Sequence, residues 1–407
     1  MKAVIMAGGE GTRLRPLTCT LPKPMARLCG RPILLYILDL LVGAGIEEAI
    51  ITLKYLPDAV TSYFKTKNYK GMKLAFVTED EPLGTAGGVK NALSSAEDDF
   101  IVISGDALCD YYLKNAAAYH REKNADVTII CARADDPREY GLVTADGEDR
   151  ISGFVEKPGW AQVTTDCANT GIYILKPSVL KLIPDGEPSD FAKNIFPRML
   201  ETDKKLFAYK ADGYWCDIGD LASYRRCQAD ILNGRVRCSI TPVAQGVFTP
   251  EKLPEGSYTL MPPVYIGRNV QIESGAVIGP DSVIDDGCLV GRGATVRESI
   301  VLPNAFVSAA AKLNGAILCD AASVKKGAQI YEGGVLGRGS VLGTDAVLRQ
   351  NVLVWPDKDI ESLSNVFENV KFGERGSSSI GESEITGEYG VELTPEKCVR
   401  LGAAIGS

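Results

Sequence analysis

The chain has 407 residues, of which 45% are hydrophobic and 24% charged, as expected of a globular protein with two or three domains. Its net charge of −8 argues against a nucleic-acid partner, so local cations must hold any polyanionic substrate. No apolar run reaches membrane-span length and Met1-Lys2 leads directly into an apolar stretch, so we expect a cytoplasmic protein without a membrane partner. The 11 cysteines include no Cys-x-x-Cys pair, which argues against zinc and redox motifs.

Short apolar strands alternate with amphipathic helices through residues 1–235, which indicates an open α/β sheet. The predicted strands are Lys2–Met6, Ala49–Leu53, Lys73–Val77, Phe100–Ser104 and Val127–Ala132. The predicted helices are Pro32–Val42, Asp58–Thr66, Gly88–Ser94 and Tyr111–Lys123. Ligands of such sheets bind at the carboxyl ends of the strands. We expect His120, the only histidine, on the surface of the last helix.

A glycine-rich segment, Ala7-Gly-Gly-Glu-Gly-Thr-Arg-Leu-Arg-Pro-Leu-Thr18, follows the first strand, and Leu21-Pro-Lys-Pro24 comes shortly after it. Three glycines within four positions let backbone amides approach an anion closely, although a tight turn would also use them. Arg13 and Lys23 add two cations that can grip phosphates. The segment lacks the third glycine of a Rossmann fingerprint and the Gly-Lys-Ser/Thr ending of a Walker A loop.

Residues 236–263 are predicted to be a linker because they are rich in proline and glycine. Aliphatic residues then recur every six positions, with a break in phase between Pro303 and Ile317. The recurring residues are Ile266, Ile272, Ile278, Ile284, Val290, Val296, Leu302, Leu318, Val324, Ile330, Leu336, Leu342, Leu348 and Val354. This period resembles the hexapeptide repeat of left-handed parallel β-helices. We therefore predict such a β-helix over residues 264–356, with an irregular turn or extruded loop at the break, and a homo-oligomer that assembles through it.

The whole segment from Ala7 to Pro24 resembles the signature of sugar-1-phosphate nucleotidylyltransferases, G-G-x-G-T-R-L-x-P-L-T followed by P-K-P. The resemblance implies a Rossmann-like, mixed-sheet nucleotidyltransferase domain over residues 1–235. It implies transfer of a nucleotidyl group from a nucleoside triphosphate to a hexose 1-phosphate, with Mg²⁺ as cofactor and pyrophosphate as product. The implied contacts to the triphosphate are Ala7, Gly8, Gly9, Gly11 and Thr12. Arg13 and Lys23 are the implied catalytic cations.

Other motifs of this family appear later in the chain. Asp106 ends Ser104-Gly-Asp106 and Asp217 lies in Tyr214-Trp-Cys-Asp-Ile-Gly219, and the resemblance makes both Mg²⁺ ligands, with Asp106 also catalytic. A helix N-cap is the alternative role for Asp106. Three further stretches match sugar-contacting segments of the family, although each alone reads as a surface turn. The residues implied to bind the sugar phosphate are Gly141, Glu156, Lys157 and Asn169.

The nucleobase is expected near Glu79, with Gly84 and Thr85 also contacting the nucleotide. Family members that use dTTP or UTP commonly carry a glutamine five residues before the glycine that is Gly84 here, and this chain has Glu79 there. A carboxylate only accepts hydrogen bonds, which suits the adjacent N1–H and N2–H₂ donors of guanine. GTP is therefore favoured, with Glu81 as an alternative acceptor and a solvated acidic loop as the plainer interpretation.

Residues 357–407 contain Lys371-Phe-Gly-Glu-Arg-Gly376 and Glu392-Leu-Thr-Pro-Glu-Lys397, which resemble the opening of a phosphohexomutase domain that is truncated here. No mutase activity is expected, because the catalytic phosphoserine loop is absent. Phosphomannomutase makes mannose 1-phosphate, so this tail and Glu79 together favour a mannose-1-phosphate guanylyltransferase. The alternatives are a glucose-1-phosphate nucleotidylyltransferase (UTP, dTTP, ATP or GTP) and a catalytically silent regulatory homologue. A hexapeptide acyltransferase is disfavoured, because the coils lack a histidine base.

Overall fold

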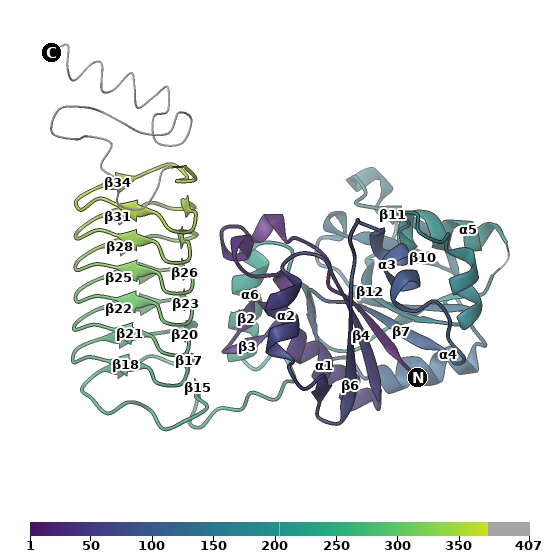
Figure 1. The fold of residues 1–407 in the computed structure, drawn as a ribbon, viewed down its shortest axis with the longest axis horizontal. Helices are drawn as coiled ribbons and strands as arrows, with labels where there is room; N and C mark the ends of the chain where they lie inside the picture. Colours follow the sequence, from purple (N-terminus) through teal and green to yellow (C-terminus); the bar gives the residue numbers. More distant parts are fainter. Residues whose placement is uncertain (203, 373–407) are drawn as a thin grey trace, which may run out of the picture. The chain divides into compact units, whose positions relative to one another are not determined.

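The computed structural model describes residues 1–202 and 204–372, which form two compact units (Figure 1). The first unit comprises Met1–Arg13, Leu21–Ser223 and Arg235–Cys238. The second comprises Leu14–Thr20, Tyr224–Gly234 and the chain from Ser239 onward. Residues 373–407, which contain most of the mutase-like motifs, lie outside the described residues. Within the described part of the chain, no helix has the length and apolar character needed to cross a membrane.

A ten-stranded mixed sheet forms the core of the first unit. Its strands follow the order β11-β10-β12-β7-β1-β4-β6-β5, and β9 pairs with β12 and β13. Their bounds are β1 Ala3–Met6, β4 Glu48–Leu53, β5 Asn68–Tyr69, β6 Met72–Thr78, β7 Phe100–Ser104, β9 Val127–Arg133, β10 Gly141–Ala145, β11 Ile151–Glu156, β12 Cys167–Leu175 and β13 Leu206–Lys210. Two small antiparallel pairs accompany the sheet: β2 Arg27–Leu28 with β3 Arg31–Pro32, and β8 Ala107–Cys109 with β14 Trp215–Asp217.

The centre of the sheet is parallel, because β1 pairs with both β4 and β7, and β4 pairs with β6. Strands β1, β4 and β7 are buried along almost their whole length, which explains their continuous apolar runs. The chain moves outward from β1 through β4 to β6 and then returns to β7 on the other side of β1. The carboxyl ends of β1 and β7 therefore form a topological switch point, where open α/β sheets bind ligands. The predicted α/β fold is confirmed.

The helices of the first unit are α1 Ile33–Ala44, α2 Pro57–Tyr63, α3 Gly84–Ala92, α4 Leu113–Glu122 and α5 Phe196–Glu201, and the first four agree broadly with the predicted positions. Helix α6 Leu221–Leu232 belongs mostly to the second unit. Helix α1 ends at Gly45, whose φ of 81° closes the helix in the left-handed conformation. Helix α3 begins one turn earlier than predicted, because the carbonyl of Ser189 accepts hydrogen bonds from the Ala86 and Gly87 amides (2.9 and 3.2 Å). A distant residue thus caps a glycine-rich helix start that the local sequence does not favour.

His120 differs from its prediction, since its side chain is 1% exposed and not on the surface. Its Nδ1 lies 2.8 Å from the Thr128 hydroxyl on β9. Burial lowers the pKa of this imidazole, an effect that the nearby Asp99 only partly opposes.

The second unit contains three parallel sheets that stack coil on coil, as in a β-helix. The first sheet consists of β15 Val247–Phe248, β17 Val264–Ile266, β20 Ser282–Ile284, β23 Ile300–Val301, β26 Ile317–Leu318, β29 Val335–Leu336 and β32 Leu353–Val354. The second consists of β16 Thr259–Leu260, β19 Val277–Ile278, β22 Thr295–Arg297, β25 Lys312–Asn314, β28 Gln329–Ile330, β31 Val347–Leu348 and β34 Asn365–Val366. The third consists of β18 Gln271–Ile272, β21 Leu289–Val290, β24 Phe306–Val307, β27 Ser323–Val324, β30 Val341–Leu342 and β33 Asp359–Ile360. The coils thus extend beyond the predicted residues 264–356 at both ends.

The predicted irregular turn or extruded loop between Pro303 and Ile317 is wrong, because β24 and β25 continue the coil through this stretch. Ile266 pairs with Ile284 at a spacing of 18 residues, whereas Ile284 pairs with Val301 at 17. Val301, and not Leu302, therefore enters the interior cluster of aliphatic side chains. Two corners are each one residue short, between Val296 and Val301 and between Leu313 and Leu318, so the phase of the repeat shifts twice while the coil itself remains intact.

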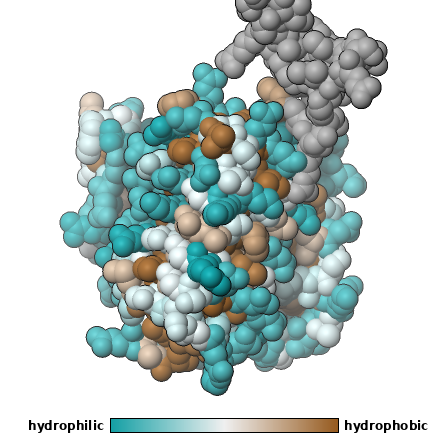
Figure 2. Space-filling model, turned by 90° about the vertical axis from the view of Figure 1, so that its left-hand side faces the viewer, coloured by the Kyte–Doolittle hydropathy of each residue, from teal (hydrophilic) through white to brown (hydrophobic). Residues whose placement is uncertain are grey.

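The outward side chains of the first of these sheets are buried, among them Val283, Ile300, Ile317 and Val335, each at most 2% exposed. Helix α6, most of which belongs to the second unit, lies along this sheet: Arg225 donates to the Gly315 carbonyl (2.5 Å) and Asn233, just after the helix, donates to Asp281 (2.7 Å). Figure 2 shows another face of the β-helix, where hydrophobic side chains form scattered patches among hydrophilic ones. Assembly into a homo-oligomer stays a prediction.

Candidate active site

The glycine-rich segment begins where β1 ends, at the switch point of the sheet. The Ala7 amide donates to the Thr52 carbonyl (3.1 Å), which keeps the segment aligned with β4. A Cβ on Gly8 would lie 3.5 Å from the Cβ of Lys54, while a Cβ on Gly9 would meet nothing within 4 Å. The segment then turns into η1 (Thr12–Leu14), and Gly9, Thr12 and Arg13 are exposed. These exposed positions are accessible to an anion, and binding of phosphates by the amides of the segment stays a prediction.

Two carboxylates and one ammonium group meet beside this segment. Asp106 follows β7, and Asp217 ends β14, which pairs with β8 so that Asp217 lies opposite Ala107. Lys23, in η3 (Lys23–Met25), is 8% exposed and places its Nζ 2.5 Å from Asp106 Oδ2 and 3.8 Å from Asp217 Oδ1. The predicted pairing of the two aspartates, which are far apart in the sequence, therefore matches their positions in the structure.

Neighbouring residues hold this cluster in place. The Ser104 hydroxyl donates to Asp106 Oδ1, and the Ile218 amide donates to the Asp106 carbonyl (3.1 Å). Asp110 accepts hydrogen bonds from the amides of Tyr214 and Arg237, each 2.8 Å, and so fastens the strand that carries Asp217. The N-cap alternative for Asp106 is not supported, because its carboxylate contacts Ser104 and Lys23.

The pKa values of the two aspartates are shifted in opposite directions. Burial alone would raise the pKa of Asp106, but the Lys23 ammonium and the Ser104 hydroxyl outweigh it, and the pKa is lowered. Burial and the charge of Asp106 raise the pKa of Asp217, although Lys23 and Arg13 oppose them. The pair thus holds an excess of negative charge that a second cation would neutralise.

The geometry fits a divalent cation, but only one that shares its coordination with substrate. No group of three or more candidate protein ligands occurs among the described residues. Mg²⁺ is often bound through one or two carboxylates together with substrate phosphates and water, and Asp106 and Asp217 meet that requirement. Lys23 already occupies the position of a cation between them. These two aspartates are therefore the residues that would hold the metal.

Arg13 lies beside the cluster, Lys54 follows β4 and Lys157 follows β11, and none of these three cations has an ion-pair partner in the described residues. A Cβ on Gly219 would lie 3.2 Å from the Arg13 guanidinium and 3.3 Å from Asp217 Oδ2, so Gly219 lets these two side chains converge. Unpaired cations around a switch point suit a ligand with several phosphates.

The residues predicted to bind the sugar phosphate lie in two separate parts of the first unit. Gly141 and Glu156 face each other across β10 and β11, and a Cβ on Gly141 would approach the Glu156 carboxylate at 2.7 Å. Lys157 follows directly, exposed, with a φ of 44°. Asn169 accepts a hydrogen bond from the Gly171 amide (3.0 Å), and a Cβ on Gly171 would lie 3.1 Å from Ser104 Cβ. Asn169 is thus near the aspartates, whereas Glu156 and Lys157 stand on the adjacent hairpin.

The predicted base-binding loop is anchored by a distant segment. A Cβ on Gly84, whose φ is 71°, would lie 2.5 Å from the Ser189 carbonyl oxygen, so this position requires glycine. The Thr85 hydroxyl donates to Asp190 (2.9 Å) and accepts from the Phe191 amide (3.0 Å). The side chain of Thr85 therefore anchors the loop, and a nucleotide contact at this position stays a prediction for its backbone.

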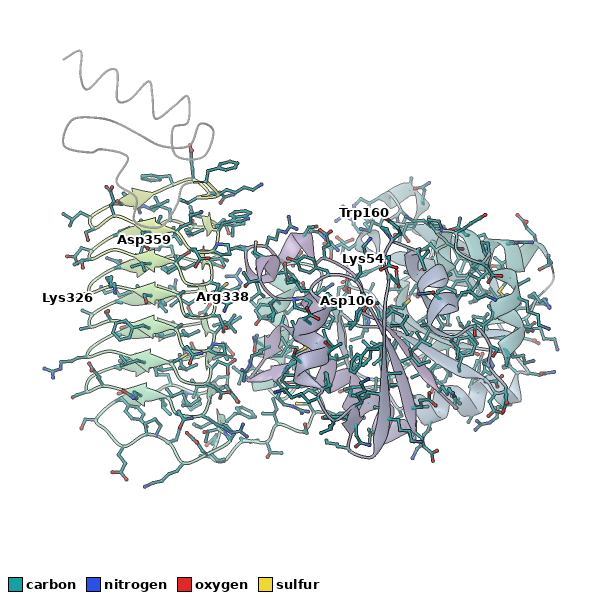
Figure 3. The ribbon with its side chains drawn as sticks, in the orientation of Figure 1. Lys54, Asp106, Trp160, Lys326, Arg338 and Asp359 are labelled. Atoms are coloured by element: carbon teal, nitrogen blue, oxygen red, sulfur yellow. The ribbon has the colours of Figure 1, made fainter. Side chains whose placement is uncertain are left out.

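Two residues of this site, Ser104 and Lys54, were not among the predicted site residues. Ser104 belongs to the Ser104-Gly-Asp106 motif, and its role as a hydrogen-bond donor follows only from the fold. Lys54 comes directly after β4, and Figure 3 shows it together with Asp106 in this unit. The sequence could have indicated Lys54, because it is a cation that comes directly after a predicted buried strand, at the edge of the parallel sheet where ligands bind.

Comparison with known families identifies the first unit. The family model described as nucleotidyl transferase matches residues 2–234. The chain belongs to the nucleotidyl transferase family. A second model, described as the GMPPB C-terminal domain, matches residues 260–369, which cover the β-helix. The predicted resemblance to sugar-1-phosphate nucleotidylyltransferases is confirmed.

Relatives of known function share most of the chain. A mannose-1-phosphate guanylyltransferase of Mycobacterium tuberculosis is 34% identical over 302 residues, covering 74% of this chain and 82% of the relative. A mannose-1-phosphate guanyltransferase of Candida albicans is 34% identical, covering 78% and 86%. A UTP–glucose-1-phosphate uridylyltransferase of Synechocystis is 33% identical, covering 77% and 86%. A crystal structure of a putative glucose-1-phosphate thymidylyltransferase from Bacillus anthracis, 23% identical, has the same fold, with a TM-score of 0.51 over 56% of this chain and 94% of that one.

Proposed function

We propose that this nucleotidyl transferase joins GTP and mannose 1-phosphate to give GDP-mannose and pyrophosphate. The observation that carries the proposal is the cluster of Lys23, Asp106 and Asp217 beside the open glycine-rich segment. Relatives named as mannose-1-phosphate guanylyltransferases, and the match of the β-helix to the GMPPB C-terminal domain, support the choice of substrates.

In the proposed reaction a phosphate oxygen of the sugar 1-phosphate attacks the α-phosphorus of GTP. The new P–O bond forms as the bond between the α-phosphorus and its oxygen bridge to the β-phosphorus breaks, and pyrophosphate leaves with the electron pair. No covalent enzyme intermediate is needed, so the protein acts by orientation and by neutralising charge.

The cluster and the residues around it each have a separate role in this reaction. Amides of Gly8 and Gly9 bind the triphosphate, and Arg13 stabilises the charge that grows on the departing pyrophosphate. Lys23 holds the phosphates of the two substrates near each other. Asp106 and Asp217 would hold Mg²⁺, which supplies further neutralisation of the phosphate oxygens when bound. On the adjacent hairpin, Lys157 binds the sugar phosphate and Glu156 accepts hydrogen bonds from the sugar hydroxyls.

A glucose-1-phosphate uridylyltransferase is the second candidate, because the Synechocystis relative is almost as similar as the guanylyltransferases. Pyrophosphate release with Mg²⁺, measured for GTP, UTP, dTTP and ATP in combination with mannose 1-phosphate and glucose 1-phosphate, tests both. We expect the fastest release with GTP and mannose 1-phosphate. Fastest release with UTP and glucose 1-phosphate would establish the second candidate, and no release with any pair would favour a silent homologue.

A further inference from the structure

Three parallel strands end side by side next to the proposed nucleotide site. Leu53 pairs with Thr78 at the ends of β4 and β6, so Lys54 and Glu79 follow at matching positions. The Glu79 amide donates to the Leu53 carbonyl (2.8 Å), which extends this alignment beyond the strands. On the other side of β4, Gly8 of the phosphate segment lies against Lys54. Lys54 therefore stands between the phosphate segment and the base-binding loop.

The ammonium group of Lys54 has no protein partner. Its side chain is half-buried, and in the described residues it makes neither an ion pair nor a hydrogen bond. It is close enough to Glu79 for the two charges to interact, but not to form a salt bridge within 4 Å. A lysine and a carboxylate that do not contact each other can share one bound group, which accepts a hydrogen bond from the lysine and donates to the carboxylate.

Glu79 is fixed in place, whereas Glu81 is not. One carboxylate oxygen of Glu79 accepts a hydrogen bond from the Leu83 amide (3.4 Å), and the other lies against Gly88 of α3, where a Cβ would collide with it. Burial raises the pKa of this carboxyl, while the Leu83 amide and the Lys54 charge lower it. Glu81 is exposed. The structure thus singles out Glu79 as the acceptor with a defined position.

We propose that Lys54 is a specificity-determining residue that reads guanine together with Glu79: Lys54 donates to O6, and Glu79 accepts from N1–H and N2–H₂. This inference rests on the proposed function, since it names how the same nucleotide site chooses its base. An acceptor beside two donors forms the pairing edge of guanine, and a lysine beside a carboxylate is its complement.

The other bases fit this pair less well. Uracil and thymine have one donor flanked by two acceptors, so one carbonyl oxygen faces the Glu79 carboxylate. Adenine has an unprotonated ring nitrogen where guanine has N1–H, and this nitrogen also faces the carboxylate. Each mismatch leaves a partly buried polar group without a partner, which weakens binding.

The test is the dissociation constant of GTP, inosine triphosphate and ATP, measured by calorimetry on wild type, Lys54→Met and Glu79→Gln. Inosine triphosphate keeps O6 and N1–H but lacks the N2 amino group. We expect Lys54→Met to weaken GTP and inosine triphosphate equally, by about tenfold or more, and ATP by less than about twofold, because adenine presents an amino donor to Lys54 where guanine and hypoxanthine present O6. Glu79→Gln should weaken GTP more than inosine triphosphate.

Two outcomes would overturn the proposal. An equal loss for all three nucleotides in Lys54→Met would assign Lys54 to the triphosphate, and no loss for any of them would leave it without a role in binding. A loss of GTP selectivity in Glu81→Gln but not in Glu79→Gln would move the acceptor to Glu81.

Matched controls lie at the opposite ends of the same two strands. Lys73 and Glu47 are exposed, and the Lys73 amide donates to the Glu47 carbonyl (2.8 Å) as Glu79 does to Leu53. Lys73→Met and Glu47→Gln should bind all three nucleotides as the wild type does. Pyrophosphate release measured on the same samples distinguishes failure of the base assignment from failure of the proposed function. Release with UTP alone would contradict the base assignment. No release with any nucleotide would contradict the proposed function.

Discussion

The nucleotidyl transferase unit and the β-helix differ in the kind of residue contacts that their sequences encode. In the β-helix, each interior residue packs against residues 17 or 18 positions away, and the same kind of contact repeats along the stack. In the nucleotidyl transferase unit, Lys23, Asp106 and Asp217 meet once, through the strand order of the sheet and the pairing of β8 with β14. Stability in the β-helix is therefore distributed over many similar positions, whereas function in the first unit depends on a few that cannot be exchanged.

The largest effect on stability is expected from an interior residue of the β-helix. Leu336→Ala opens a cavity at a side chain that is 0% exposed, and we expect it to destabilise the β-helix by about 2–5 kcal/mol. Leu363→Ala, at a side chain that is 78% exposed, should cost less than about 0.5 kcal/mol. Urea unfolding followed by the fluorescence of Trp355, with Trp160 and Trp215 replaced by Phe, reports on the coils. Equal losses for the two variants would contradict the inward and outward assignment.

Substitution of the charged cluster in the first unit should lower the rate of pyrophosphate release. Lys23→Met removes the ammonium that lies between the two carboxylates, and we expect pyrophosphate release to fall by about a hundredfold to a thousandfold. The control is Lys312→Met, at an exposed lysine on the β-helix, which should leave the rate unchanged. If both variants kept wild-type rates, the cluster would have no part in the reaction.

Asp217→Asn should raise the stability of the fold while it lowers the activity. Because the folded pKa of Asp217 is raised, the wild type loses stability as pH rises from the unfolded pKa, about 3.9, through the folded value. At pH 7 without metal, we therefore expect the variant to melt at a higher temperature than the wild type while it loses activity. Asp106→Asn is the matched comparison, because the pKa of Asp106 is lowered and its removal should lower the melting temperature. A lower melting temperature for both variants would contradict the opposite shifts.

The smallest effect is expected at His120, away from the site. Its folded pKa is lowered, so the unfolded chain binds the proton more readily, and stability is lost as pH falls from about 6.5 toward the folded value. The slope cannot exceed about 1.4 kcal/mol per pH unit. Melting temperatures of wild type and His120→Gln between pH 7.5 and 5.5 isolate this contribution, because the chain has no other histidine. Parallel pH profiles for the two proteins would show that His120 does not contribute.

The sequence alone predicted the fold where the pattern of apolar residues is local and repeated. The apolar strands of the parallel sheet and the six-residue period predicted both architectures, because the period of the apolar side chains follows directly from how they are buried. The phase break misled the prediction at Leu302, since Val301 and Leu302 are both apolar and only the register of the coils decides which one points inward.

Contacts between distant residues were harder to predict. The early start of α3 depends on the Ser189 carbonyl, which no local pattern announces. The pairing of Asp106 with Asp217 was predicted only through the family resemblance, and the pairing of β8 with β14 explains it. The burial of His120 follows from how α4 packs against β9, and a single polar residue in a sequence carries no signal of that. Lys54 could have been found from its place directly after a predicted strand.

The most direct measurement of the proposed chemistry is the configuration at phosphorus. GTP made chiral at the α-phosphorus by a sulfur substitution can be converted with mannose 1-phosphate, and the configuration of the GDP-mannose analogue read by ³¹P NMR. A single in-line attack by the sugar phosphate, aligned by Lys23 and Arg13, predicts inversion at phosphorus. Retention would require a covalent intermediate on the protein and would contradict the account.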